Sequence, residues 1–435
     1  MTRGYVPASD APCLIHMEDN RFPLVFFEVL VFGGSYDDPP GLEGLADLTA
    51  LNLLRGTTRR SHAEVMDGFN DLGASVDVTS HREYISISGD FMPRCMEPFT
   101  SLLCEVLSRP AFPVQEFRKE RALALEDIRN LVNDDAELAR QHFHRYIYGD
   151  RLDGRPSSGW FRTVSKISVQ DCRDFYQGHF VSGNVAVVLA GAISRELADD
   201  FASRVVGSLR TGPSAVPPEV DDSPVNGGRI LIVDKPGRNQ AQVVMGHPSA
   251  GWNCPDLFAL LVGNTAFGGT FTSRLVDEIR EKRGWSYGVS SSIFAGRTSG
   301  TLMMRFFPEN RDLAPAIELV EKLFSSTAFG GLSADEVDAA RKYLIRQYPF
   351  RIETVRKRAD ELVADLVFGR PAGVMSRFVE LVSSQDGQAV NQSLGRHFRP
   401  ADLSTVLVGT AAEIRRDLVA LAGAGSVDTV DYRSE

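Results

Sequence analysis

Two stretches of this sequence each have a similar second copy, and in both cases the copy follows at nearly the same distance along the chain. This duplication limits the folds that the chain can adopt. The segment HFVSGNVAVVLAG, from His179 to Gly191, aligns without gaps on HFRPADLSTVLVG, from His397 to Gly409. The predicted helix starts VQEFRKERALAL (Val114–Leu125) and ADEVDAARKYLI (Ala334–Ile345) form a second pair. Both pairs are separated by about 220 residues, and two matches at one offset indicate a duplicated unit. We therefore expect two halves with the same order of elements.

A proline-rich stretch separates these halves. RTGPSAVPPEVDDSPVNGG, from Arg210 to Gly228, has no apolar periodicity, and its composition is typical of a linker. The chain has 435 residues, which is more than one ordinary hydrophobic core organises. We predict an N-terminal half over residues 1–210, a linker over 211–228 and a C-terminal half over 229–435.

Each half mixes strand and helix patterns in a similar order. This mixture favours an α+β fold of two homologous αβ sandwich halves, each a mainly antiparallel sheet packed with helices. In the first half the patterns predict a strand, a helix and a hairpin at Pro23–Ser35, Leu42–Arg55 and Ala74–Phe91. In the second half they predict two strands, two helices and a hairpin at 230–234, 241–245, 255–267, 273–282 and 287–307.

Charge and hydropathy restrict the partners of the chain. A formal net charge of −10 argues against nucleic acid or an anionic membrane as the main partner. The apolar run Leu24–Phe32 is interrupted by Glu28 and is too short to span a bilayer. The first residues also lack the apolar core of a signal peptide. We expect neither a nucleic-acid partner nor a membrane partner.

The cysteines and histidines show no recognisable motif. The five cysteines are widely spaced and include no CxxC pair, so we expect buried or idle thiols. His142 and His144 lie two positions apart in a helical segment, where their side chains face different directions. We interpret them as surface or half-buried histidines. None of the other histidines stands beside a serine or cysteine in a nucleophile motif.

The order of several longer motifs resembles the pitrilysin/insulinase family of zinc peptidases, in particular the branch of the mitochondrial processing peptidase. The most specific stretch is FGGTFTSRLVDEIREKRGWSYGVSS, beginning at Phe267, in which glycines, Ser-Arg-Leu, a basic helix end and a tyrosine follow the family order. The resemblance covers nearly the whole chain. It also rests on GLADLTALNLLRGT (Gly44–Thr57), ERALALEDI (Glu120–Ile128), YGDRLDGRPSSGW (Tyr148–Trp160) and FYQGHFVSGNVAVVLAG (Phe175–Gly191).

Catalytic members of that family carry HxxEH on the first helix and a further glutamate on a later helix. The two histidines share one helix face and bind zinc, and the glutamate beside them activates its water. Alignment on Gly44–Thr57 places Asp47 and Leu51 at the histidine positions, Ala50 at the glutamate position and Asp127 at the distal glutamate position. Leucine and alanine bind no metal, so the resemblance implies no zinc and no cofactor in this chain. The alternative is a peptidase acting alone through another metal at Asp47 and Asp127.

In the family, an arginine near a helix end and a tyrosine seven residues later are directed at the active site. Arg280 and Tyr287 occupy these positions, and the resemblance implies that they bind the substrate carbonyl and its oxyanion. The structural alternative is a basic helix end capped by Gly284, with the tyrosine packed at a strand start. Gly268 and Gly269 resemble a substrate-binding glycine loop; a tight turn with positive φ is the alternative.

These features together imply the non-catalytic subunit of a heterodimeric zinc metallopeptidase, inactive alone. A homologous HxxEH subunit would supply the zinc, and unfolded peptides would be the substrate, bound partly by strand addition at a sheet edge. The alternative is a structural scaffold similar to the core proteins of the respiratory cytochrome bc1 complex. We expect a bacterial periplasmic protein whose signal peptide is absent from this sequence, with the cytoplasm as the alternative.

Overall fold

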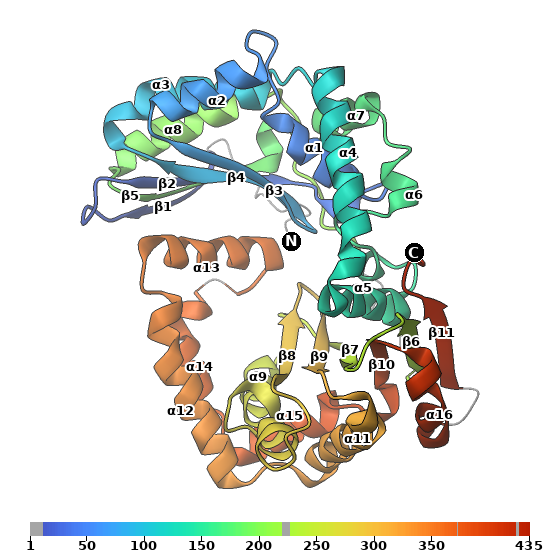
Figure 1. Ribbon diagram of the computed structural model, residues 1–435. Coiled ribbons are helices and arrows are strands. Elements are labelled where there is room, and N and C mark those ends of the chain that lie inside the picture. Colours follow the sequence, from blue (N-terminus) through green and yellow to red (C-terminus); the bar gives the residue numbers. More distant parts are fainter. Residues whose placement is uncertain (1–11, 220–226, 372, 423–425) are drawn as a thin grey trace. The chain divides into compact units, whose positions relative to one another are not determined.

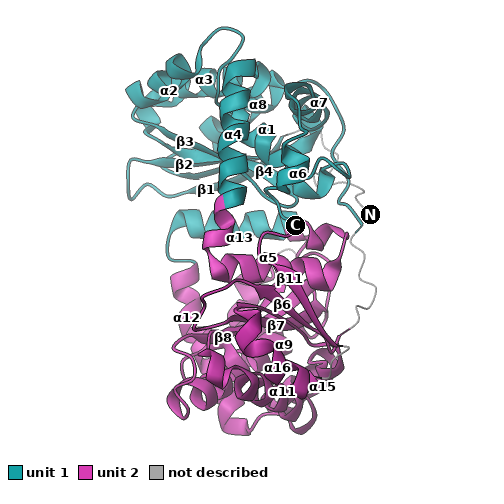
Figure 2. Cartoon of the chain, turned by 45° about the vertical axis from the view of Figure 1, so that its right-hand side comes forward, with its two compact units in different colours: residues 1–129, 156–219, 352–367 teal, residues 130–155, 220–351, 368–435 magenta. Residues whose placement is uncertain are grey.

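The structure of the chain, a computed structural model, contains two compact units with one β-sheet each (Figure 1). It describes residues 12–219, 227–371, 373–422 and 426–435. The first unit comprises Met1–Arg129, Pro156–Glu219 and Ile352–Val367, and the second comprises Asn130–Arg155, Val220–Arg351 and Phe368–Glu435 (Figure 2). Two mixed sheets packed with helices confirm the predicted α+β fold.

The first sheet has the strand order β1-β5-β2-β4-β3. Its strands are β1 (Cys13–Glu18), β2 (Val25–Phe32), β3 (Ser75–Ser80), β4 (Tyr84–Phe91) and β5 (Val185–Gly191). β1 runs parallel to β5, and the other neighbours are antiparallel. All residues of β2 are buried. Because side chains alternate along a strand, the centre of the sheet is covered on both faces.

One face of this sheet is packed by helices around a cluster of phenylalanines. The rings of Phe91 and Phe99 stack with centroids 4.3 Å apart, and Phe27 meets Phe99 edge-on at 4.9 Å. These contacts fix the sheet against α3 and, through Phe201, against α8. The helices of the first unit are α1 (Leu45–Leu53), α2 (His62–Asp71), α3 (Met96–Ser108), α4 (Val114–Asn130), α6 (Phe161–Val164), α7 (Val169–His179), α8 (Arg195–Ser208) and α13 (Val355–Phe368).

The second sheet repeats this order and adds one strand at its edge. Its order is β11-β6-β10-β7-β9-β8, so β6, β10, β7, β9 and β8 take the places of β1, β5, β2, β4 and β3. β6 runs parallel to both of its neighbours, and the remaining pairs are antiparallel. The strands are β6 (Ile230–Asp234), β7 (Gln242–Ala250), β8 (Val289–Ala295), β9 (Ser299–Phe306), β10 (Ser404–Gly409) and β11 (Val427–Asp431).

The helices of the second unit include two π-helical turns, at Thr265–Gly269 and Asp277–Glu281. They occupy the ends of the two predicted helices at 255–267 and 273–282. The α-helices are α5 (Asp135–Tyr148), α9 (Leu257–Asn264), α10 (Arg274–Val276), α11 (Leu313–Gly330), α12 (Ala334–Arg351), α14 (Phe378–Ser383), α15 (Gly387–His397) and α16 (Ala411–Ala422). No helix within the described ranges has both the length and the apolar character that crossing a membrane requires.

The two units exchange one helix each. Helix α5 belongs to the N-terminal half of the sequence, yet Phe143 and Ile147 on it pack against Val244 of β7 and Val406 of β10. The repeat counterpart of α5 is α13, which lies along the face of the first sheet opposite α3 and α8 (Figures 1 and 2). There the Arg356 guanidinium lies 4.3 Å from the centroid of the Phe26 ring on β2.

The compact units therefore differ from the predicted halves at these two helices. Residues 130–155 join the second unit and residues 352–367 join the first. A sequence repeat reveals which elements correspond, but it does not reveal which copy of the sheet each helix covers. Within the predicted linker over 211–228, residues 220–226 lie outside the described residues.

Candidate functional site

Helix α1 carries Asp47, Ala50 and Leu51, three of the four positions that the sequence alignment assigned to a zinc site. Its first turn is capped by Asp38, whose carboxylate accepts hydrogen bonds from the backbone N–H of Gly44 at 2.7 Å and of Ala46 at 2.8 Å. Gly44 stands at φ +98°, a conformation that favours glycine. This cap and the buried apolar stripe of the helix hold α1 in the core of the first unit.

The aligned base position and one aligned ligand position on α1 are filled by hydrocarbon. Ala50 is fully buried, and Leu51 packs against the main apolar cluster of the first unit. Neither side chain offers a lone pair to a metal or takes a proton from water. The helix keeps its packing function, but the residues that would perform zinc chemistry are absent from it.

The remaining two positions hold carboxylates that repel each other. Asp47 is half-buried on α1, and Asp127 is exposed on α4. Burial, together with the negative charge of Asp127, raises the pKa of Asp47 to about 6. In the part of the chain that the structure describes, no third histidine, thiol or carboxylate gathers with these two into a metal-binding group. The donor set thus fits a catalytic zinc poorly, since such zinc takes three protein ligands.

Substitution Asp47→Asn is expected to flatten part of the pH dependence of stability. The folded-state pKa near 6 exceeds the ordinary value of about 3.9. Protonated Asp47 therefore contributes to the free energy of unfolding, and this contribution is fully present below about pH 4. It is lost as the pH rises through about 6, which lowers the free energy of unfolding by about 1–3 kcal/mol. Urea unfolding midpoints at several pH values test this. Asp67→Asn, at an exposed site on α2, is the control, and parallel profiles for wild type and Asp47→Asn would contradict the expectation.

A buried ion pair beside these positions was missed by the sequence analysis. Glu120 is buried on α4, and its Oε1 lies 2.9 Å from Nε of Arg55. The same guanidinium lies 2.9 Å from Nε2 of His62. Glu120 stands two helical turns before Asp127, on the same face of α4. The seven-residue spacing between Glu120 and Asp127 is the sequence signal from which this position could have been found. The ion pair connects the segment that follows α1 to α4.

His142 and His144 have the half-buried environment that the sequence analysis predicted. His142 is half-buried on α5, and burial lowers its pKa to about 4, so the imidazole is neutral at physiological pH. All five cysteines are free thiols; Cys172 is buried and the others are half-buried. His142 and His144 belong to no metal-binding group among the described residues.

Arg280 and Tyr287 are brought together on the second unit. The Arg280 guanidinium carbon lies 4.9 Å from the centroid of the Tyr287 ring and 5.4 Å from that of Phe271. Tyr287 is 81 % exposed and Phe271 is 80 % exposed. The Arg280 guanidinium therefore makes cation–π contacts with two exposed rings, and its Nε also lies 3.4 Å from Oε1 of Glu281. These contacts limit the rotamers of the arginine.

The local backbone explains why the arginine and tyrosine meet. Gly284, at φ +63°, ends the helical segment, and its N–H donates to the Arg280 carbonyl at 3.0 Å. Trp285 N–H likewise donates to the Ile279 carbonyl at 3.0 Å. The helix-end alternative therefore describes the backbone correctly. A tyrosine packed at a strand start does not describe Tyr287, because its ring is exposed and its hydroxyl bonds no described residue.

Gly268 and Gly269 lie in the first π-helical turn, and neither has positive φ. The tight-turn alternative is therefore wrong for both. Gly268 is buried for a different reason: a Cβ there would stand 2.5 Å from Cβ of Ser291 on β8. Only glycine allows that close approach of helix and strand. Gly269 is exposed, with no Cβ contact shorter than 3.5 Å, so any peptide contact by this pair is left to Gly269.

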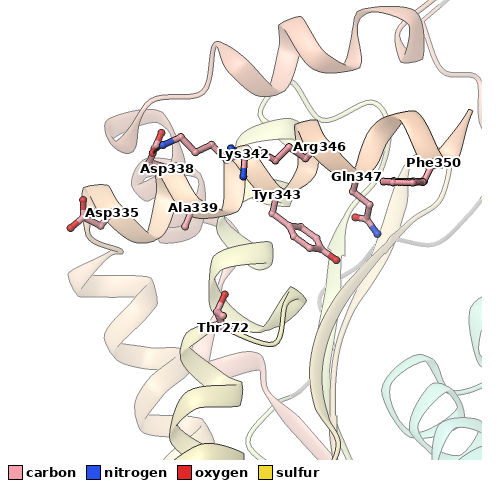
Figure 3. Close-up of a pocket in the computed structure, with 9 residues that line it drawn as sticks. All are labelled: Thr272, Asp335, Asp338, Ala339, Lys342, Tyr343, Arg346, Gln347 and Phe350. Carbon is pink, nitrogen blue, oxygen red and sulfur yellow. Dashed lines mark ion pairs between the residues drawn. The ribbon is translucent and has the colours of Figure 1, made fainter.

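A pocket of 610 Å³ lies beside the Arg280 stack. Helix α12 forms one wall, and Thr272, the chain neighbour of Phe271, lines the other side. Figure 3 shows Tyr343 and Gln347 pointing from α12 to the side on which Thr272 lies. The lining mixes charges of both signs with aromatic rings, which suits an extended peptide better than a small apolar ligand. The full lining comprises Thr272, Asp335, Asp338, Ala339, Lys342, Tyr343, Arg346, Gln347 and Phe350.

The fold is that of a duplicated α+β chain, with one similar sheet in each of its two units. Comparison with known families agrees: residues 16–157 match the profile described as insulinase (peptidase family M16), and residues 166–344 match that of the peptidase M16 inactive domain. The chain belongs to the M16 peptidase (insulinase) family.

Relatives of the chain include proteins named as peptidases and one named as inactive. An uncharacterized zinc protease of Mycobacterium leprae is 23 % identical over 85 % of this chain and 84 % of its own length. The non-peptidase homolog YmxG of Helicobacter pylori is 22 % identical, covering 91 % of each chain. A protein named as a protease and one named as a non-peptidase are thus about equally similar to this chain. Overall sequence similarity therefore does not decide whether this chain is an active peptidase.

Solved structures share the fold over nearly the whole chain. A peptidase M16 inactive domain from Pseudomonas fluorescens has a TM-score of 0.84 at 22 % identity, covering 91 % of this chain and 95 % of its own. A chain of Complex III2 from Candida albicans has a TM-score of 0.76 at 12 % identity, covering 96 % of this chain and 98 % of its own. At these identities the similarity establishes the fold, and function has to be argued from the site.

Proposed function

We propose that this chain is the non-catalytic subunit, without a catalytic zinc, of a heterodimeric metallopeptidase of the processing-peptidase type. A homologous HxxEH subunit supplies the zinc and the base, and this chain supplies Arg280 and Tyr287. The observation that carries the proposal is the exposed pair itself: Tyr287 presents a hydroxyl that bonds no described residue, beside a guanidinium fixed by two rings. We further propose a periplasmic location in a bacterium.

The chemistry of the pair suits the developing charge of peptide hydrolysis. The zinc of the partner subunit would supply an activated water for attack on the peptide carbonyl, and negative charge would develop on the carbonyl oxygen. The phenol of Tyr287 and the guanidinium of Arg280 are hydrogen-bond donors that can stabilise an oxyanion while keeping their own protons. Their function needs a partner, because α1 of this chain carries Ala50 and Leu51 where base and ligand would stand.

The surroundings of the pair supply places for the rest of a peptide. The pocket along α12 opens beside Phe271 and contains Asp338, Lys342 and Arg346, which offer both signs of charge. β8 begins two residues after Tyr287 and is the outermost strand of its sheet. Part of its edge is already used, since the Asn264 amide donates to the Ser291 carbonyl at 3.1 Å. β3, which pairs only with β4, is the other edge suited to strand addition.

The similar proteins support this proposal, and they also indicate the alternative function with which it has to be compared. A non-peptidase homolog stands among them, in line with lost zinc ligands. A chain of Complex III2 shares the fold, so a scaffold role is the competing function. A scaffold gives no reason for an arginine and a tyrosine to be exposed side by side.

Association with an HxxEH homologue from the same genome is the direct test. The co-expressed pair is expected to elute from size exclusion as a one-to-one complex, with chelator-sensitive peptide hydrolysis. Two chains that enclose a substrate need an interface beyond about 1,600 Å² of buried surface, which is in the size range of specific, stable complexes. Separate elution of the two chains at micromolar concentration would contradict the proposal. Isolation of the chain within a membrane complex would favour the scaffold.

A further inference from the structure

Three potential metal ligands converge where α9 begins and α15 ends. Cys254 Sγ lies 2.9 Å from Oδ1 of Asp256 and 3.6 Å from Nε2 of His397. The same Oδ1 and Nε2 lie 3.0 Å apart. Among the described residues, this is the only group of three such donors within mutual reach. It lies in the second unit, away from the degenerate positions on α1 and α4.

The fold positions each of the three side chains independently. Cys254 lies in the turn after β7, Asp256 is the residue that precedes α9, and His397 is the last residue of α15. α9 and α15 pack closely, because Gly263 on α9 lets the Leu394 side chain approach to 2.8 Å from where a Cβ would stand. Ser393 Oγ also donates to the Asp256 carbonyl at 3.3 Å. The donors are thus held by packing rather than by a mobile loop.

The geometry distinguishes metal binding from nucleophilic catalysis. In a Cys–His–Asp relay, the thiol contacts one ring nitrogen and the carboxylate orients the histidine through the other. Here both contacts converge on Nε2 of His397. Convergence of sulfur, nitrogen and oxygen on one point is the arrangement of a coordination site.

We propose that Cys254, Asp256 and His397 bind a divalent transition-metal ion of the Zn²⁺ type. Metal–donor bonds of about 2.0–2.3 Å place tetrahedral donors about 3.3–3.6 Å apart. The sulfur–nitrogen distance of 3.6 Å already fits, and the two contacts to Oδ1, at 2.9 and 3.0 Å, have to lengthen by only a few tenths of an ångström. The Cys254 proton leaves for solvent on binding, because a coordinating thiol is deprotonated.

The donor set and its exposure agree with this assignment. Thiolate, imidazole and carboxylate together suit zinc rather than Mg²⁺ or Ca²⁺, which prefer oxygen ligands. The side chains of Asp256 and His397 are 19 % and 20 % exposed, which leaves room for a water as fourth ligand. The second oxygen of Asp256 lies 3.1 Å from the guanidinium of Arg396, which fixes the carboxylate for one-oxygen coordination.

The first half of the chain provides an internal comparison. Helix α1 is the counterpart of α9 in the first half. The residues before α1 that correspond to Cys254 and Asp256 are Leu42 and Gly44. The repeat counterpart of the α15 histidine is His179, which stacks on a phenylalanine ring and stands 4.0 Å from a single aspartate. A histidine at the end of this helix is therefore compatible with the fold without a metal. The cysteine and aspartate are additions of the second half.

Cobalt titration of the full chain tests the site. Protein stripped by a chelator and dialysed is titrated with Co²⁺ and then with Zn²⁺ as competitor. One equivalent of Co²⁺ is expected to give a thiolate-to-metal charge-transfer band and tetrahedral d–d bands, both removed by Zn²⁺. Cys254→Ser and His397→Gln are expected to lower Zn²⁺ affinity by more than about 100-fold, since even outer-shell partners are worth about 10–100-fold.

Matched variants separate this site from unspecific binding and from misfolding. Cys104→Ser, which removes another half-buried thiol, and Asp47→Asn are expected to leave the titration unchanged. Zn²⁺ should raise the melting temperature of wild type but not that of Cys254→Ser, with both apoproteins melting alike. A wild-type chain without a one-equivalent thiolate band, or a band that persists in Cys254→Ser, would overturn the proposal. Neither result bears on Arg280 and Tyr287, so the two proposals fail separately.

Discussion

Tyr287→Phe is expected to lower kcat of the reconstituted peptidase by ~10²–10³-fold while the complex stays intact. The substitution removes one oxyanion donor and leaves the aromatic ring over which the Arg280 guanidinium lies at 4.9 Å. Because the ring is 81 % exposed, loss of the hydroxyl should change the melting temperature little. The measurement is kcat and KM of the variant complex with a fluorogenic peptide. A fall in kcat with assembly intact indicates an interaction made in the transition state.

Arg280→Ala is expected to cause a loss of similar size, and two other residues of the second unit provide matched controls. Arg283, three residues further along, pairs with Glu278 at 2.6 Å and stacks on Trp285, so Arg283→Ala removes a charge without touching the pair. Tyr432→Phe removes a phenol hydroxyl from a half-buried tyrosine that does not line the pocket. Both controls should retain kcat within a few-fold. Wild-type turnover in Tyr287→Phe and Arg280→Ala would leave the scaffold as the better account.

The isolated chain is expected to hydrolyse no peptide above the buffer rate, whereas the mixture with its HxxEH partner is active. The physical reason is the absence of a base at Ala50 and of a ligand at Leu51, which leaves α1 without the groups that would activate water there. The zinc subunit alone should in turn be ~10²–10³-fold slower than the mixture, because it lacks the two donors. The measurement compares three samples at equal zinc content: each chain separately and both together.

Two outcomes would redirect the interpretation. Equal turnover by the zinc subunit alone and by the mixture would show that this chain contributes nothing to catalysis. Chelator-sensitive turnover by the isolated chain would indicate a metal of its own, and its position could then be found by substitution. Loss with Asp47→Asn would point to α1 and α4, and loss with Cys254→Ser would point to the group at α9 and α15.

The fold could be predicted from sequence because its signals are local or repeated. The alternating pattern over Ala74–Phe91 became the hairpin of β3 and β4, and the apolar run after Pro23, interrupted only by Glu28, became the buried strand β2. The aligned segments at His179 and His397 lead into β5 and β10, which hold the same place in the two sheets. Period and spacing are properties of neighbouring residues, so one sequence suffices to read them.

The parts that sequence missed depend on contacts between distant segments. Gly268 owes its place to a strand that follows some twenty residues later, and no local pattern marks such an approach. Arg55 and Glu120, like Cys254 and His397, meet only through helix packing. The positions of Arg280 and Tyr287 came from a family motif. Their exposure, which separates a binding role from a packing role, is visible only in three dimensions.

The exchange of α5 and α13 limits the order in which the two units can fold while the chain is being synthesised. The first sheet is complete in sequence by residue 191, but the helix along its second face comes from residues 352–367. Helix α5 is synthesised early, but the strands against which it packs begin only at residue 230. Neither unit can finish folding on the ribosome before most of the other has been made. A cut within residues 211–228 should therefore leave two fragments that stay associated, and each fragment produced alone should expose a bare sheet face and aggregate.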